Sequence, residues 1–181
     1  MIVDRLERNH FANTLGAKIE TIKHQKSIVS LLVSEQHLNP NGAVHGGVLM
    51  TLADTAAGAS MVYLGQPTAT IDLSYRFLKP VFSGDLLMAK ARVIQSGKTV
   101  IVVEIHLYII NQPEYDNIID LTNISAENLD QNISAENLDK KLIGAATASF
   151  FRRDRHLPEL PPEIFDLADQ FIRDYIAKKS E

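Results

Sequence analysis

An apolar stretch from residue 46 to residue 64 carries a single charge, Asp54, near its centre. The loop before it ends His45-Gly46-Gly47, and Gly65-Gln66-Pro67 follows it. Glycine and proline at these ends predict a helix that begins near Gly46 and ends near residue 64. A helix that is apolar on all sides has to be buried, either in a protein core or in a membrane.

The same stretch is long enough for a membrane, because about 20 apolar residues cross a bilayer. Three features favour a protein core instead: the central Asp54, several glycines and alanines, and the absence of a basic flank. The nearest basic residues are Lys26 and Arg76. We therefore predict a core helix and no membrane association.

Alternating apolar and polar residues predict a set of strands around this helix. In the clearest case, Ile71, Leu73, Tyr75 and Phe77 are expected to share one face, with Thr70 on the other. The turn sequences Ser83-Gly84-Asp85 and Ser96-Gly97-Lys98 predict hairpins between the later strands. The result is a meandering antiparallel sheet wrapped around the helix, which is an α+β fold. The predicted strands span about residues 15–23, 28–33, 70–79, 86–94, 101–109 and 142–151.

The chain is expected to form one domain over residues 1–181, with a core from about 12 to 152. A short helix is predicted at 2–13 and a longer one at about 162–179, which packs on its own domain or on another subunit. Residues 111–140 form an insertion in which Asn123–Asp130 recurs as Asn132–Asp139. The repeat is interpreted as an exposed loop duplication, with partner binding as the alternative.

Composition excludes several classes of function. The net charge of −4 argues against a nucleic-acid binder, which usually has a basic face. The absence of cysteine excludes disulfides and thiolate nucleophiles and fits the cytoplasm, and the N-terminal residues are charged rather than signal-like. The six histidines are scattered, so we expect neither a metal site nor a cofactor.

Asp54 is the first candidate for chemistry. Burying a carboxylate is costly unless it is paired or used, and burial also makes a carboxylate a better base. A structural alternative is a carboxylate that is satisfied by a hydrogen bond at a subunit interface.

Three blocks of the sequence combine residue types at distinctive spacings. They are Asn39-x-x-Gly42-x-x-His45-Gly46-Gly47 with Leu52-x-Asp54-x-Ala56-x-Gly58, Thr70–Tyr75 with Phe77-Leu78-Lys79-Pro80 and Gly84-Asp85, and Ser96–Thr99 with Leu142–Ala148. Together these blocks resemble the hotdog-fold acyl-CoA thioesterases of the phenylacetate-pathway and 4-hydroxybenzoyl-CoA thioesterase type. The resemblance covers about residues 12–152.

This resemblance implies a hotdog fold, a homodimer or homotetramer, and an active site between two subunits. Asp54 would be the general base or the nucleophile toward the thioester carbonyl of an acyl- or aryl-CoA. The backbone N–H of Gly46 or Gly47 would bind the carbonyl oxygen at the positive end of the helix. Such a donor is typically worth about 10²–10³ in rate.

The resemblance also implies supporting roles. Asn39 would orient the carbonyl or the attacking water, Thr70 would hold that water, and His45 would fix the loop. Coenzyme A carries phosphates, so basic residues are expected at the mouth of the site. The candidates for phosphate binding are Arg76, Lys79 and Lys98.

Two rival functions stay open. One is a non-catalytic acyl-CoA sensor. The other is a hotdog enoyl-thioester hydratase or dehydratase, which pairs a histidine with a carboxylate. His45 and Asp54 are nine residues apart across a loop-to-helix junction, and the Pro-Gly loop of the dehydratases is missing before the helix.

Overall fold

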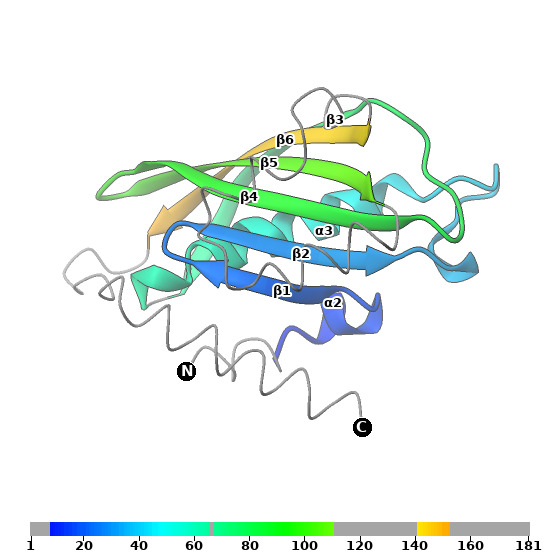
Figure 1. The fold of residues 1–181 in the computed structure, drawn as a ribbon. Helices are drawn as coiled ribbons and strands as arrows, with labels where there is room; N and C mark the ends of the chain where they lie inside the picture. The colour runs from blue at the N-terminus through cyan, green and yellow to red at the C-terminus, as the bar shows by residue number, and fades with distance from the viewer. Residues whose placement is uncertain (1–7, 66, 111–140, 153–181) are drawn as a thin grey trace.

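The computed structural model describes residues 8–65, 67–110 and 141–152. In these ranges a long antiparallel sheet carries the helix α3 along one of its faces (Figure 1). The predicted α+β architecture, a sheet around a central helix, is confirmed. The elements are α2 (His10–Thr14), β1 (Lys18–Lys23), β2 (Lys26–Leu32), η1 (Glu35–His37), α3 (Gly46–Ser60), η2 (Val62–Leu64), β3 (Thr68–Phe77), β4 (Leu86–Ser96), β5 (Val100–Ile110) and β6 (Leu142–Arg152).

The strand order differs from a simple meander. The described strands lie in the order β1-β2-β4-β5-β6-β3, so β4 pairs with β2 and β3 forms the far edge beside β6. The predicted hairpin between β3 and β4 through Ser83-Gly84-Asp85 was therefore wrong. The chain crosses the face of the sheet as α3 before it enters β3, and this crossing carries β3 to the opposite edge.

Helix α3 begins at Gly46, as the sequence predicts, and the helical stretch reaches the predicted end near residue 64 through a 3₁₀ turn. His45 is its N-cap, with extended backbone, and its Nδ1 accepts the Gly47 N–H. Capping by a side chain satisfies one of the amides that a helix leaves unpaired at its start. The α-helix ends at Ser60, a 3₁₀ turn continues to Leu64, and Gly65 ends it in the left-handed conformation, at a φ of 65°.

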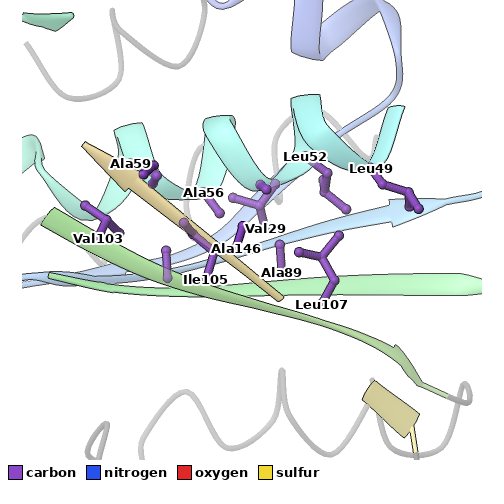
Figure 2. Close-up of a cluster of buried hydrophobic side chains, with 14 of the residues drawn as sticks. Val29, Leu49, Leu52, Ala56, Ala59, Ala89, Val103, Ile105, Leu107 and Ala146 are labelled. Atoms are coloured by element: carbon purple, nitrogen blue, oxygen red, sulfur yellow. The ribbon is translucent and has the colours of Figure 1, made fainter. Parts of the chain in front are cut away.

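The core lies between α3 and the sheet. Figure 2 shows Leu49, Leu52, Ala56 and Ala59 of the helix facing Val29, Ala89, Val103, Ile105, Leu107 and Ala146 of the strands. Alanines on the helix let it approach the sheet closely. By length and composition the stretch from Gly46 to Leu64 could cross a membrane, yet 61% of it is buried inside this fold. It has the packing of a core helix.

One side of α3 is nevertheless left uncovered by the described residues. Seven of its residues are exposed or only partly buried, and they recur three or four positions apart, which places them on one face. We call this face the open stripe. The prediction that α3 is buried on all sides was therefore wrong for the open stripe within one chain. The open stripe consists of Gly46, Gly47, Met50, Thr51, Asp54, Thr55 and Gly58.

A bulge changes the face assignment at the start of β3. Thr70 pairs with Phe150 and Leu73 pairs with Ala148, with a register shift between Thr70 and Asp72. Phe150 and Ala148 are buried beneath α3, so Thr70 shares the helix-facing side with Leu73. The prediction that Thr70 faces away from Leu73 was wrong, because an extra residue in a strand reverses the alternation. Ile71, at the bulge, is 57% exposed.

Three predicted segments lie outside the described residues: the start of the N-terminal helix, the insertion at 111–140 with its repeat, and the C-terminal helix at about 162–179. The described part of the N-terminal prediction is α2.

Candidate active site

Asp54 and Thr70 meet in space although they come from different elements. Thr70 Oγ1 donates a hydrogen bond of 2.9 Å to Asp54 Oδ1. Asp54 lies in the open stripe of α3 and is half-buried. The expectation of a fully buried carboxylate was therefore wrong for the chain by itself. One carboxylate oxygen is engaged by a neutral hydroxyl, which leaves the charge without a cationic partner among the described residues.

The two glycine amides at the start of α3 are not equivalent. The Gly47 N–H donates to His45 Nδ1 at 3.0 Å, so that donor is already used. The Gly46 N–H has no acceptor among the described residues, and Gly46 is partly exposed. The sequence left these two amides as alternatives. The geometry leaves the Gly46 amide available at the positive end of the helix.

His45 joins this amide pair to the preceding loop. Its backbone N–H donates to the His37 carbonyl at 2.8 Å, and its ring caps α3. His37 is buried, with its ring bonded to the Ser34 N–H and to the Leu15 carbonyl. The loop that presents Gly46 is thereby tied to the body of the domain.

Asn39 stabilises the tip of the same loop. Its Oδ1 accepts the Asn41 N–H at 2.8 Å, and its carbonyl accepts the Gly42 N–H at 3.0 Å. Gly42 has a φ of 78°, which favours glycine. Because Oδ1 is held by the loop, the side-chain NH₂ group of Asn39 is the part left to donate to a ligand.

Two aromatic residues of the predicted apolar face of β3, Tyr75 and Phe77, pack on each other, and Phe77 lies beside Gly46. A Cβ built on Gly46 would lie 3.1 Å from two ring atoms of Phe77. The Phe77 ring packs on the Tyr75 ring, with centroids 4.5 Å apart. The Tyr75 hydroxyl is buried, and no described residue bonds to it. Burial raises the pKa of Tyr75 above its usual value, so the hydroxyl stays neutral.

Within one chain, Asp54 and the Gly46 amide do not converge. They lie eight positions apart on α3, which is about 12 Å along a helix axis. A single carbonyl group cannot contact both. The predicted site residues therefore form two clusters, with Thr70 and Asp54 in one and Gly46 and His45 in the other.

The predicted phosphate-binding residues are exposed but dispersed. Arg76 lies on β3 and Lys79 just beyond it, whereas Lys98 lies in the β4–β5 turn. Arg76 is level with His106 on β5, and the turn begins six residues away, which is about 20 Å along a strand. Within the described ranges, no three residues of the metal-ligating types gather into a site.

Comparison with known proteins adds the family. The family described as the Thioesterase superfamily matches residues 41–114. Acyl-coenzyme A thioesterase PaaI of Escherichia coli is 34% identical over 108 residues, which cover 60% of this chain and 76% of that protein. The chain spans about half the length of other curated relatives that it matches.

Solved structures share the fold. The E. coli PaaI protein from the phenylacetic acid degradation operon aligns with a TM-score of 0.65 at 24% identity, over 83% of this chain and 89% of that one. A hypothetical thioesterase of Streptococcus pneumoniae, solved with coenzyme A, aligns with a TM-score of 0.56 at 23% identity, over 75% of this chain and 86% of that one. The chain therefore belongs to the thioesterase superfamily and has its hotdog fold.

Proposed function

We propose that this protein hydrolyses the thioester of an acyl- or aryl-CoA to a free acid and coenzyme A, with Asp54 as general base or nucleophile. The observation that carries the proposal is the pair of complementary half-sites on α3: an amide donor at Gly46 and a carboxylate at Asp54. The relatives named acyl-CoA thioesterase and the relative solved with coenzyme A support the substrate class.

A second copy of the chain would unite the two half-sites. The midpoint between Gly46 and Asp54 is Met50, which lies in the open stripe. Two α3 helices that cross antiparallel at Met50 bring Gly46 of one subunit against Asp54 of the partner subunit, and the reverse, as two-fold symmetry requires. We propose that the active site forms at this interface, in a dimer or in a tetramer built from it.

The edge strand offers a second surface for the same contact. β3 is hydrogen-bonded to β6 on one side and to no described strand on the other. An unpaired edge of ten residues readily pairs with another chain. Pairing of β3 with its own copy would extend the sheet and cover the open stripe, which would also desolvate Asp54.

The chemistry follows from this arrangement. The Gly46 amide, with the Asn39 NH₂ group, stabilises the negative charge that develops on the carbonyl oxygen. Asp54 removes a proton from water as the water attacks, or attacks the carbonyl itself and is then released by water. Thr70 holds the carboxylate, or the water, in place. The carbon–sulfur bond breaks and coenzyme A leaves as the thiol. Oxygen-18 labelling in a single turnover separates the two routes.

Phosphate binding by Arg76, Lys79 and Lys98 is part of the proposal. About 20 Å along the strands separates Arg76 from the β4–β5 turn that carries Lys98, so the three residues of one chain cannot bind the same phosphate group. We propose that Arg76 and Lys79 of one subunit and Lys98 of the other bind the phosphates of one coenzyme A.

A thiol-release assay over a panel of acyl-CoA esters tests the activity. Asp54→Asn should lower kcat by about 10²–10⁴, the usual contribution of a general base. Asp72→Asn is the matched control, because Asp72 is an exposed carboxylate on the same strand as Thr70. Equal thiol release by Asp54→Asn and wild type would exclude Asp54 from the chemistry. Saturable binding without thiol release in the wild type would favour the sensor, and water addition to an enoyl-CoA would favour the hydratase.

Proline at position 46 tests the amide. Proline removes the N–H but suits the first position of a helix, and His45 already has the extended backbone that precedes proline. Gly46→Pro should lower kcat by about 10²–10³. Gly46→Ala adds a Cβ that crowds Phe77, as proline does, but keeps the N–H, so it should lose clearly less activity than Gly46→Pro. Equal losses in the two variants would show that the amide does not bind the carbonyl.

Mixing inactive variants tests the interface. In a mixed dimer of Asp54→Asn and Gly46→Pro chains, one site receives both defects and the other receives neither. Each mixed dimer has one intact site of two, so about a quarter of the wild-type activity should return if half of the dimers are mixed, and about a half if all of them are. No recovery, with subunit exchange verified by size and mass, would contradict a shared site.

A further inference from the structure

We propose that Phe77 is a specificity-determining residue that selects against acyl groups branched at the carbon next to the thioester carbonyl. The inference rests on the proposed function, in which the carbonyl oxygen accepts the Gly46 N–H. Phe77 lies at the edge of the space next to this amide.

The contact between Phe77 and Gly46 is close and specific. Two Phe77 ring atoms lie 3.1 Å from the position of a Gly46 Cβ, and apart from chain neighbours and the helix itself no other described residue comes within 4 Å of it. Phe77 is also 54% exposed, so a substrate that approaches the amide from solvent can contact it. The ring therefore forms one wall of the space beside the Gly46 N–H.

Tyr75 and the core restrict the movement of the Phe77 ring. The centroids of the Tyr75 and Phe77 rings are 4.5 Å apart, and the ring planes are tilted by 47°. Tyr75 in turn lies over Gly144 of β6, where even a Cβ would collide with the Tyr75 hydroxyl. Tyr75 packs against the buried core. Phe77 consequently cannot swing inward to make room for a wider substrate, and it moves only toward solvent.

The steric consequence falls on the first carbon of the acyl group. When the carbonyl oxygen accepts from the Gly46 N–H, the carbonyl carbon lies beside the helix start, and the next acyl carbon lies one bond further. A CH₂ group at that position can lie flat against an aromatic ring. A methyl branch there must displace the ring or lengthen the hydrogen bond to Gly46, and close-packed sites resist both.

The test compares matched substrates in the thiol-release assay with the purified full chain. Each pair differs by one methyl group on the carbon next to the carbonyl: butyryl-CoA with 2-methylbutyryl-CoA, and phenylacetyl-CoA with 2-phenylpropanoyl-CoA. The wild type should favour the unbranched ester of each pair that it hydrolyses by at least tenfold in kcat/KM. Phe77→Ala should reduce this preference at least fivefold, mainly through faster turnover of the branched ester, and Phe77→Leu should lie between the two.

Phe82→Ala is the matched control. Phe82 is another aromatic residue of similar exposure, at 51%, and none of its atoms lies within 4 Å of a Cβ built on Gly46, so its loss should leave the preference unchanged. A ratio within one pair is insensitive to a general loss of folded protein. An unchanged ratio in both Phe77 variants, or no preference in the wild type, would overturn the inference while the hydrolase stands. Absence of thiol release from every ester of the panel, these four included, would instead overturn the proposed function, and the inference with it.

Discussion

The Thr70 hydroxyl lies 2.9 Å from Asp54 Oδ1, so the first residues of the edge strand are tied to the middle of the central helix. The register shift that follows Thr70 makes this contact possible, because it turns the side chain toward α3. The contact holds one oxygen of the carboxylate, and no described residue bonds to the other.

Replacement of Thr70 tests that role. Thr70→Val keeps the shape and removes the donor, and Thr70→Ser keeps the donor. A hydrogen bond to a charged group is worth about 1.5–3 kcal/mol, so kcat in Thr70→Val should fall roughly tenfold or more. Thr70→Ser should retain most of the wild-type kcat. Steady-state thiol release measures both, and equal losses in the two variants would argue that the methyl group matters rather than the hydroxyl.

His45 provides a test of stability. His45→Ala removes the side-chain acceptor of the Gly47 N–H, and loss of an N-cap costs about 0.5–2 kcal/mol of unfolding free energy. His45→Asn supplies another capping side chain and should recover most of that loss. Urea denaturation followed by circular dichroism gives the values. If alanine and asparagine prove equally destabilising, the histidine ring does more than cap the helix.

Tyr75 predicts a pH dependence at the alkaline end. The Tyr75 pKa is raised in the folded state by burial, so above pH 10 the unfolded chain loses a proton that the folded chain keeps. The contribution of Tyr75 to the unfolding free energy is therefore fully present below pH 10 and is lost as the pH rises further. Tyr75→Phe removes this contribution and, since the buried hydroxyl has no described partner, should not lower stability at pH 7. Melting temperatures between pH 7 and 11 test this. A steeper alkaline loss in Tyr75→Phe than in the wild type would contradict it.

Gly144 should not tolerate a larger residue. A Cβ there would lie 1.9 Å from the Tyr75 hydroxyl oxygen and 2.5 Å from the ring carbon that bears it. Gly144→Ala should destabilise the protein by about 1–3 kcal/mol, the usual cost of overpacking. The same substitution should cost less in a Tyr75→Ala background, because the colliding group is gone. A double-mutant cycle of unfolding free energies measures this coupling, and strict additivity would exclude the contact as its cause.

Several elements could be predicted because their causes are local. The helix boundaries followed from His45 before Gly46 and from glycine after Leu64, both of which act within a few residues. The long strands followed from alternation, and β4, β5 and β6 lie within two residues of their predicted limits. The resemblance supplied the hotdog fold, which the family and the solved relatives confirm.

Other features depend on pairing over long distances. The strand order could not be predicted, because the turn after β3 resembles a hairpin and only the crossing of α3 sends that strand to the far edge. Alternation failed at Thr70 because a single bulged residue reverses every side chain on one side of it. The insertion and the C-terminal helix, which lie outside the described residues, stay predictions.

The sequence by itself determined that one apolar helix with a lone carboxylate would be enclosed by long antiparallel strands, because periodicity and helix-end residues act over a few positions. Only the tertiary structure decided which face of α3 remains open, and that Thr70 lies beside Asp54 and Phe77 beside Gly46. These are contacts between residues far apart in the chain, and their geometry depends on strand register and packing, which a one-dimensional pattern does not specify.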